Sequence, residues 1–173
     1  VKTFLSWWGR ELDSLIPKIL KDGAYHSGHF LMIALESTEA VILLKNKNNW
    51  TEEGRIPLDS ITNTARHYFD SISRAVMRPK TSVVLRLPAH HGLLKILEFP
   101  LASARDLRKI LENQMGRVTP YQAHQVYFDY RLLDRDFAKD KLRVELIASP
   151  RDFVDATLAK LESWGIKPDF LDL

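Results

Sequence analysis

The sequence contains no cysteine among its 173 residues. Disulfide bonds, thiolate nucleophiles and cysteine-based zinc sites are therefore excluded. The sequence also has no uninterrupted apolar run close to the roughly eighteen residues that mark a transmembrane helix, so no segment of it is expected to span a bilayer. Because the chain starts at Val1 rather than at methionine, we expect it to be part of a longer protein.

The sequence also lacks a large excess of charge of either sign. Lysine and arginine number 25 against 22 acidic residues, which gives a net charge of +3, and the two signs are interspersed along the chain. A nucleic-acid surface usually gathers its basic residues in one patch, so a nucleic-acid binder ranks only third among the possible functions. Hydrophobic residues at 45% and charged residues at 27% are typical of a globular domain.

Two short apolar runs, residues 30–35 and 40–44, organise the rest of the chain. They are too brief for buried helices and rich in strand-forming residues, which indicates strands that are covered on both faces. The four polar residues 36–39 between them allow only a tight turn. We therefore predict an antiparallel hairpin at the centre of a sheet with helices on both faces.

Residues 3–21 have helical spacing, with Phe4, Trp8, Leu12, Leu15 and Ile19 on one stripe and a break near Pro17. Trp7 lies off that stripe. Two interpretations stay open for Trp7: partial cover by the fold, or an anchor for a partner or membrane surface.

The remaining elements alternate along the chain. We expect an edge strand at 50–58 and a helix capped by Asp59 or Ser60, with Ile61, Ala65, Tyr68, Phe69, Ile72 and Val76 on its face. Strands follow at 82–87 and 93–99, then a helix that begins at Ser103 and ends at Gly116. Two paired strands, 125–133 and 142–148, precede a helix with Ser149 as its N-cap residue, Pro150 at its first position and Gly165 at its end, and a last strand covers 166–173.

Three meandering strands followed by alternating helices and strands predict an α/β fold of the ribonuclease H-like or actin-like class, with a mixed sheet and flanking helices. Residues 1–29 would form an N-terminal helical segment. Residues 30–88 and 142–173 would form the actin-like core, and residues 89–141 a small inserted α+β subdomain.

The chemistry expected of that fold class is poorly supported. A phosphate loop between the first two strands is usually rich in glycine, which lets backbone N–H groups approach the phosphates. Residues 36–39 read Glu-Ser-Thr-Glu, and each carboxylate close to a phosphate costs about 1 kcal/mol in water and more where water is excluded. A magnesium ion bridged through Glu36 would offset this cost, so nucleotide binding is disfavoured without being excluded.

Other catalytic or metal sites find less support. A ribonuclease needs a second acidic residue at the end of the fourth strand, where Arg86, Leu87 and Pro88 stand instead. The pairs His26/His29 and His90/His91 have no third ligand nearby in the sequence, which favours solvated loop histidines. No serine stands in a nucleophile-elbow motif. We therefore expect no catalytic residue, no metal ligand and no cofactor.

Several short motifs resemble one bacterial family. They are LRLP at 85–88, LEFPLA at 97–102 and VTPYQAHQVYFD at 118–129, followed by ASPRDFVD at 148–155 and GIKPDFLD at 165–172, with FLSWWGREL at the opening 4–12. Together they are similar to the cytoplasmic region of type II secretion system protein L and to the related type IV pilus assembly proteins M and N. The similar motifs occur in this order over most of the chain.

This resemblance implies a degenerate actin-like fold that precedes a transmembrane helix and a periplasmic domain and that docks an assembly ATPase and other platform subunits. The expected location is the cytoplasmic face of the bacterial inner membrane, with a membrane span beyond Leu173 and a possible homodimer. The pilus protein M relatives bind nucleotide through a first loop that contains glycine, and the loop of this chain has none. We therefore expect a non-catalytic scaffold, with an actin-like nucleotide-binding module as the alternative.

A scaffold works through its surface, and three side chains are candidates for partner binding. Tyr127 and Arg131 lie four residues apart on the more polar face of a strand, with Asp129 between them, and Trp7 lies off its helical stripe. Tyrosine, arginine and tryptophan are the residue types that contribute most at binding hot spots. The open alternative is that both aromatic side chains simply lie against a neighbouring helix.

Overall fold

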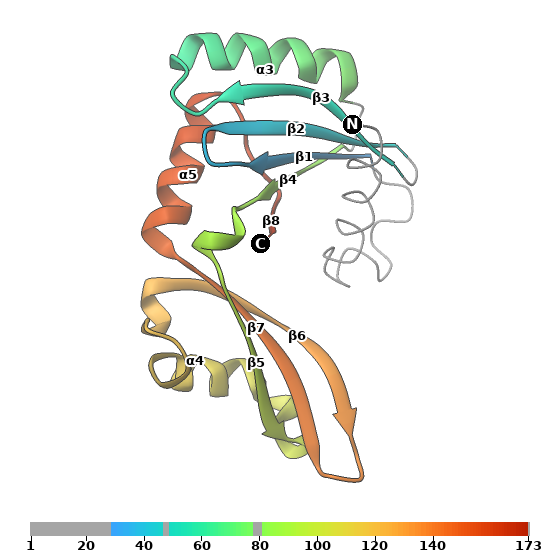
Figure 1. Cartoon of the computed structure of the whole chain (residues 1–173), viewed down its shortest axis with the longest axis vertical. Helices are drawn as coiled ribbons and strands as arrows, with labels where there is room; N and C mark the ends of the chain where they lie inside the picture. Colours follow the sequence, from blue (N-terminus) through green and yellow to red (C-terminus); the bar gives the residue numbers. More distant parts are fainter. Residues whose placement is uncertain (1–28, 47–48, 78–80, 173) are drawn as a thin grey trace. The chain divides into compact units, whose positions relative to one another are not determined.

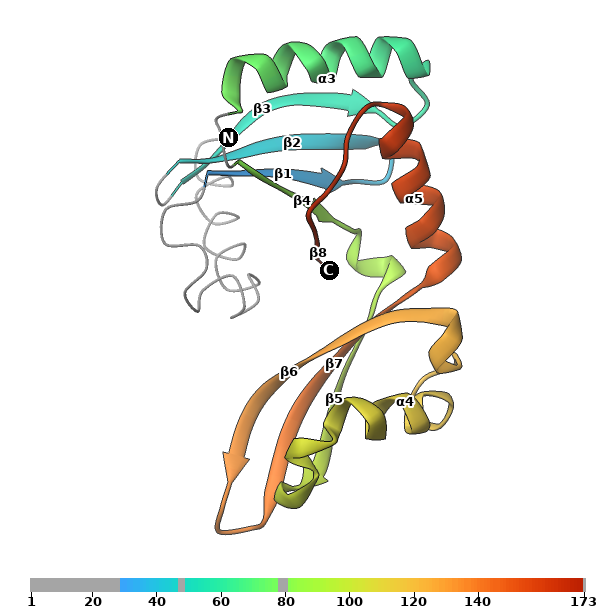
Figure 2. The ribbon, with the colours of Figure 1, turned by 180° about the vertical axis from the view of Figure 1, so that it is seen from behind.

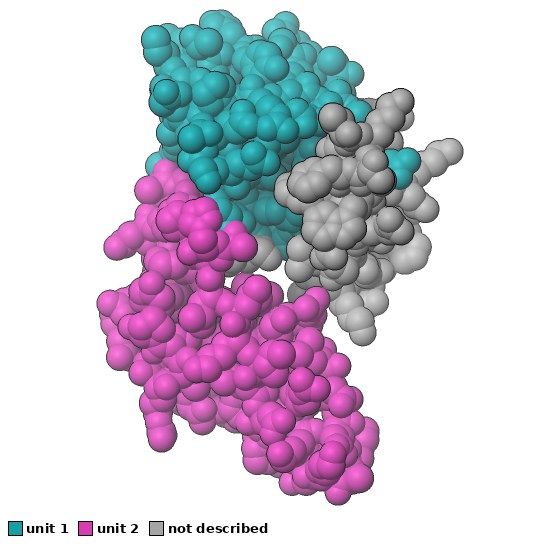
Figure 3. All heavy atoms as spheres, viewed as in Figure 1, with its two compact units in different colours: residues 1–88, 158–172 teal, residues 89–157, 173 magenta. Residues whose placement is uncertain are grey.

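The computed structural model describes residues 29–46, 49–77 and 81–172 (Figure 1). The chain divides into two compact units, which are coloured separately in Figure 3. The first unit comprises residues up to 88 together with residues 158–172, and the second comprises residues 89–157. Apart from His29, the expected N-terminal helical segment 1–29, with Trp7, lies outside the described residues.

The first unit contains a five-stranded mixed sheet in the order β3-β2-β1-β4-β8. β1 pairs antiparallel with β2 and parallel with β4, β2 pairs antiparallel with β3, and β4 pairs parallel with β8. This arrangement confirms the predicted ribonuclease H-like/actin-like fold class, with β3 at one edge. The strands are β1 (Phe30–Leu35), β2 (Glu39–Asn46), β3 (Asn49–Pro57), β4 (Ser82–Arg86) and β8 (Phe170–Asp172).

The predicted hairpin lies at the centre of this sheet. Every residue of β1 is buried, and Leu31, Ile33 and Ile42 have no measurable exposure. The pairing runs from Phe30 opposite Lys45 to Leu35 opposite Ala40, so the tight turn closes directly beyond the last pair. Continuous apolar sequence is what a strand between two neighbours and two covered faces requires.

Among the described residues, two helices contribute to the first unit, α3 (Thr62–Val76) and the end of α5 (Arg151–Ser163). Helix α3 lies along β3 in both ribbon views (Figures 1 and 2). At Gly54 of β3, a Cβ atom would come within 2.6 Å of Ile72 Cδ1, so the close approach of the helix requires glycine there. The guanidinium of Arg66 on α3 donates a hydrogen bond to the carbonyl of Ser163 at 2.8 Å, which joins the two helices.

The N-terminus of α3 differs from the expectation. Ile61, rather than Asp59 or Ser60, occupies the N-cap position, and its side chain makes no capping hydrogen bond. Ile61 is 76% exposed and Tyr68 is 43% exposed, so neither belongs to the buried face. The buried face consists of Ala65, Phe69 and Ile72.

The second unit is a three-stranded antiparallel sheet in the order β5-β7-β6, with α4 between β5 and β6 in sequence. The expected boundary at residue 142 was wrong in one respect. It assigned the sequence of β7 to the actin-like core, whereas β7 pairs with β5 on one side and β6 on the other. The elements are β5 (Leu93–Pro100), α4 (Leu107–Val118), β6 (Val126–Asp136) and β7 (Lys141–Pro150), with short 3-10 turns at Ala89–His91, Leu101–Arg105 and Ala123–Gln125.

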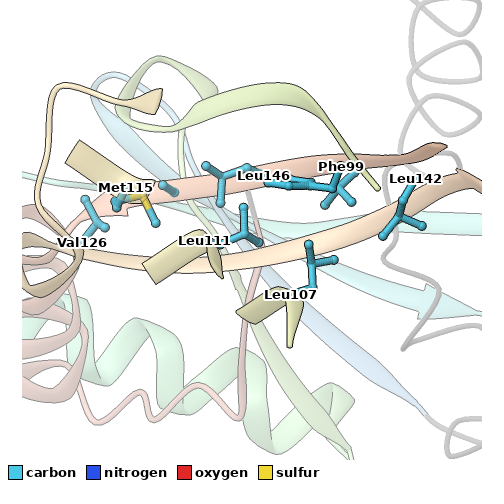
Figure 4. Packing of buried hydrophobic residues seen from close by; sticks show 9 residues of the cluster. Phe99, Leu107, Leu111, Met115, Val126, Leu142 and Leu146 are labelled. Carbon is cyan, nitrogen blue, oxygen red and sulfur yellow. The ribbon is translucent and has the colours of Figure 1, made fainter. Parts of the chain in front are cut away.

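A separate apolar core holds the second unit together. Helix α4 buries Leu107, Leu111 and Met115, four residues apart, against alternate residues of β7 such as Leu142 and Leu146 (Figure 4). The alternation follows from the strand period of two, which sends every second side chain toward the helix. The cluster is completed by Phe99, Val126, Val144 and Ala148.

Two further helix boundaries depend on tertiary contacts. Helix α4 continues past Gly116 to Val118 and ends where the N–H of Thr119 bonds to the carbonyl of Met115 at 2.8 Å. A Cβ atom on Gly116 would come within 2.6 Å of the Gln122 side chain, so the glycine serves this close contact. Helix α5 begins at Arg151, two residues after Ser149, so Ser149 is not its N-cap residue; the Ser149 hydroxyl donates to the carbonyl of His91 at 3.0 Å.

The end of α5 agrees with the prediction. Gly165 has a φ of +83°, the left-handed conformation that glycine adopts at low cost. Its N–H bonds to the carbonyl of Glu162, and the N–H of Ile166 bonds to the carbonyl of Leu161. These two bonds form a Schellman motif, which satisfies carbonyls that the helix end would otherwise leave free.

Candidate functional site

The β1–β2 turn is where an actin-like domain would cradle a phosphate. Here the turn is closed by its own backbone, because the N–H of Glu36 donates to the carbonyl of Glu39 at 2.8 Å. A second bond of 2.8 Å, from the N–H of Leu58 to the carbonyl of Thr38, ties the turn to the residues that follow β3. This turn is therefore a compact structure without glycine.

Arg55 on β3 binds the carboxylates around this turn. Its guanidinium makes a two-point contact with Glu52, from Nε to Oε1 at 2.7 Å and from an Nη to Oε2 at 2.9 Å. The other Nη donates to Glu39 and lies 3.8 Å from Glu36. The hydrogen bond from Arg55 holds the pKa of Glu52 below its ordinary value, and the bonds to Glu52 and Glu39 raise the pKa of Arg55.

The charges at this turn oppose an incoming phosphate. One guanidinium faces the three carboxylates of Glu36, Glu39 and Glu52, so the local balance is negative. The positive charge that a phosphate would need is already bound to carboxylates of the chain itself. In the described part of the chain, no group of three or more histidine or acidic side chains is placed to hold a metal ion.

Tyr127 lies on β6 and is 37% exposed, at the start of the strand face predicted for partner binding. Its hydroxyl is 3.0 Å from Asp155 Oδ1 on α5. The guanidinium of Arg151 lies over its ring, 4.2 Å from the centroid. Part of the ring is therefore held against the first turns of α5, and the remainder of the side chain faces outward.

Arg131, the second strand candidate, bonds to Glu145 on β7. The Arg131 side chain is 33% exposed and that of Glu145 17%, so the pair is partly shielded from water. Arg131 lies opposite Glu145, and Tyr127 lies opposite Ser149, so both candidates occupy one face of the sheet. A role for Tyr127, Arg131 and Trp7 in partner binding stays a prediction.

The adjacent histidines His90 and His91 of the second unit contact neighbouring rings. The ring of His91 stacks on Phe153 of α5, with centroids 3.8 Å apart and an angle of 12° between the planes. His90 lies next to it at 4.4 Å.

The second unit exposes apolar side chains that were not predicted from the sequence. Leu94 and Ile96 on β5 are 53% and 52% exposed, and Phe137 in the β6–β7 turn is 78% exposed. The alternation of residues 94, 96 and 98 on one side of a strand was the available signal. It was hidden because residues 93 and 97 are also apolar.

Comparison with known proteins gives a relative in sequence. No family model matches the chain. The chain is 39% identical over 80 residues to type II secretion system protein L of Xanthomonas campestris pv. campestris. This stretch is 46% of the chain and 21% of that protein, so the match spans only a small part of the relative.

Two solved structures have the same fold. The PilM–PilN type IV pilus biogenesis complex matches with a TM-score of 0.62 and 15% identity, over 83% of this chain and 46% of the other. The cytoplasmic domain of EpsL, an inner membrane component of the type II secretion system of Vibrio cholerae, matches with a TM-score of 0.54 and 18% identity, over 83% and 57%. The chain thus spans about half the length of each structure. Sequence identities this low show a shared fold and nothing about a shared function. Together the matches confirm the resemblance in the sequence motifs.

Proposed function

We propose that the chain, which resembles type II secretion system protein L in sequence and shares its fold with type IV pilus and type II secretion platform proteins, is a non-catalytic scaffold of an inner-membrane assembly platform. It docks the assembly ATPase and other platform subunits at the cytoplasmic face of the membrane. The domain of EpsL that shares the fold is described as the cytoplasmic part of an inner membrane component, which supports this location.

The membrane attachment belongs to the proposal. None of the helices in residues 29–46, 49–77 and 81–172 is long and apolar enough to cross a membrane. We propose that a span beyond Leu173 anchors the scaffold, as the resemblance implies.

The observation that carries the non-catalytic part of the proposal is the contact of Arg55 with the β1–β2 turn. The position that would accept a phosphate presents Glu36 and Glu39, and the nearest guanidinium already binds Glu39 and Glu52. A nucleotide would have to displace Arg55 and also approach the carboxylates, at a cost of about 1 kcal/mol for each close like-charge pair even in water. The platform role therefore rests on docking surfaces.

A titration with ATP and magnesium separates the scaffold from the alternative, an actin-like nucleotide-binding module. We expect no hydrolysis of ATP or GTP and no micromolar binding by calorimetry. The matched control is Glu36→Ala, which removes one carboxylate from the turn. Micromolar binding of magnesium–ATP by the parent protein, abolished by Glu36→Ala, would establish the alternative instead. Salt-dependent binding of DNA would point to the third function, nucleic-acid binding.

A further inference from the structure

One face of the five-stranded sheet carries both described helices of the first unit. A Cβ atom on Gly54, which lies opposite Ile42, would meet Ile72 of α3, so α3 covers the face to which Ile42 points. The connections from β3 to β4 and from β4 to β8 both join parallel strands and cross the sheet in the same direction. Such connections are right-handed, so the end of α5 lies on the same face as α3. The hydrogen bond from Arg66 of α3 to Ser163 of α5 agrees with this placement.

The opposite face of the sheet is apolar and equally buried. Successive residues of a strand point to opposite faces, so the neighbours of Ile33 and Ile42 point away from α3. Those neighbours form a cluster that is only 2–6% exposed, and β4 adds one more buried residue opposite Met32. We call these residues the second face: Met32, Ala34, Val41, Leu43 and Val84. Neither of the two described helices of the first unit lies over the second face, although its side chains are shielded from water.

A charged pair shows how far this shielding extends. Arg86 lies opposite Ala34 and donates to Asp172 Oδ2 of β8 at 2.8 Å. Their side chains are only 13% and 6% exposed. On β3, by contrast, the side chains of Glu52 and Arg55 are 35% and 44% exposed. The cover therefore extends from β2 across β1 and β4 to β8, a width of about 14 Å, and does not include β3.

We propose that residues 1–28 of the same chain cover the second face. They dock through the apolar stripe of their predicted helix, which consists of Phe4, Trp8, Leu12, Leu15 and Ile19. A helix over residues 3–21 is about 28 Å long, enough to cross the buried width. Residues 22–28, which connect it to the start of β1, reach up to about 23 Å and allow the helix to return over the sheet.

The covalent connection favours this occupant over a separate partner. The segment ends next to His29 and β1, which lies within the second face, so the segment is present there at a high effective concentration. An apolar stripe without a place to bind would remain in water, and an apolar sheet face without a cover would do the same. Docking removes both surfaces from water within one molecule.

The proposal assigns different roles to two adjacent tryptophans. Successive helical residues are about 100° apart, so Trp8 lies at the centre of the stripe and Trp7 lies beside it. Docking therefore places Trp8 against the second face and leaves Trp7 accessible to a partner. The contact needs neither nucleotide nor the assembly ATPase, so it can be tested apart from the proposed function.

The first experiment measures how fast a thiol reagent labels single cysteines in the full chain, which has no native cysteine. Val41→Cys reports on the second face, and Ile42→Cys is the matched control because it points toward α3. We expect slow labelling at both positions. Adding Trp8→Lys should accelerate labelling at position 41 by at least about tenfold and leave position 42 unchanged, because only the second face opens. Adding Trp7→Lys should change neither rate.

Two results of this experiment would overturn the proposal. Fast labelling at position 41 in the chain with native Trp8 would show that the second face is not covered. Slow labelling at position 41 in spite of Trp8→Lys would show that something other than the N-terminal stripe covers it. Circular dichroism establishes that each variant is folded, and Trp8→Ala takes the place of Trp8→Lys if the lysine unfolds the chain.

The second experiment identifies the occupant directly and does not depend on opening the face. A benzophenone amino acid is placed at position 8 of the full chain, irradiated, and its attachment site is located by mass spectrometry. We expect attachment within the same molecule to residues of the second face, such as Met32 or Leu43. The same group at position 7 is the control and should not attach there. Attachment from position 8 only to another molecule, or only to residues outside the second face, would contradict the proposal.

Discussion

Arg55 has a larger effect on what the β1–β2 turn can bind than on the stability of the turn. Its side chain is 44% exposed, and those of Glu36, Glu39 and Glu52 are between 29% and 41% exposed. Ion pairs with this much exposure contribute about 0–1 kcal/mol each. Their consequence is electrostatic, because the guanidinium and the carboxylates occupy each other's hydrogen-bonding groups at the place where a phosphate would approach.

The first residue-scale prediction concerns Glu52. Arg55→Gln removes the hydrogen bond that holds the pKa of Glu52 below its ordinary value, so this pKa should rise toward the usual glutamate range of about 4.3. NMR titration of the Glu52 side chain measures the change. Lys141→Gln is the control, because Lys141 lowers the pKa of Glu98 instead and should leave Glu52 unchanged.

The same variant has a defined effect on stability in acid. In the parent, the pKa of Glu52 is lower in the folded than in the unfolded state. Its stabilising contribution is therefore present above the unfolded pKa and lost as the pH falls through the folded pKa. The free energy of unfolding of Arg55→Gln should consequently fall less steeply than that of the parent below about pH 5. Equal slopes in urea denaturation series would show that Arg55 does not act on Glu52.

The second residue-scale prediction tests the docking face. Tyr127→Ala and Arg131→Ala should each weaken binding of the system's assembly ATPase by about 2 kcal/mol or more, close to thirtyfold, if these are hot-spot residues. Trp7→Ala, outside the described residues, belongs in the same titration. Tyr68→Ala is the matched control, because Tyr68 is a similarly exposed tyrosine in the first unit. Folded variants that all bind like the parent would place the docking surface elsewhere.

At the scale of elements, the central hairpin supports a prediction of stability. Leu43 on β2 is 6% exposed and belongs to a buried cluster with Met32, Ala34 and Val41, against which Trp50 packs. Leu43→Ala should therefore lower the free energy of unfolding by about 2–5 kcal/mol, measured by chemical denaturation. Ile61→Ala is the control, because Ile61 is 76% exposed and should cost little. A loss below about 1 kcal/mol for Leu43→Ala would contradict the burial of this strand.

Strands were easier to predict from the sequence than helix ends, for a physical reason. A buried strand carries its signal in the side chains themselves, as residues 30–35 do. The signal for a helix end is a serine or a glycine whose role depends on distant residues. The partner that hydrogen-bonds to the serine hydroxyl, or the side chain that packs against the glycine, comes from another part of the chain. Ser149 bonds to His91, and Gly116 accommodates Gln122, so both signals were real while their assignment as helix boundaries was wrong.

The candidate site was predictable only in part, for a related reason. Glu36 and Glu39 are only three residues apart in the sequence, so both carboxylates could be assigned to one turn. Arg55 reaches them only because β2 and β3 pair in one particular register, with Glu39 opposite Pro57 and an irregularity at Ile42/Leu43. The spacing of residues in the sequence does not specify which residues of β2 and β3 lie opposite each other.

At the scale of the whole molecule, the buried cluster of the second unit shares no residue with the cluster around Leu43 in the first unit. The second unit has its own cluster, in which Leu111, Met115, Leu142, Val144 and Leu146 are fully buried. Within the part of the chain that the structure describes, the strands of this cluster pair only with one another. We therefore propose that the two units are separate folding domains, with the return to the first domain inside α5 rather than at residue 142.

This proposal predicts that residues 89–157 fold when they are produced alone. The fragment retains all three strands, α4 and the nine residues of its buried cluster. A domain this small buries a modest fraction of its surface, so we expect a stability of only a few kcal/mol, near the lower end of the usual range of about 5–15 kcal/mol. Cooperative thermal unfolding by circular dichroism and dispersed amide signals by NMR would be the expected observations.

Leu111→Ala in the same fragment supplies the test that the fold is the native one. Leu111 has no exposure and lies in the middle of the α4 face, so its truncation should cost about 2–5 kcal/mol and leave the fragment largely unfolded. Phe137→Ala, which alters an exposed side chain, should leave the transition nearly unchanged. If the fragment gives a coil spectrum without a cooperative transition, its core needs the first unit to fold, and the chain is one folding domain with two sheets.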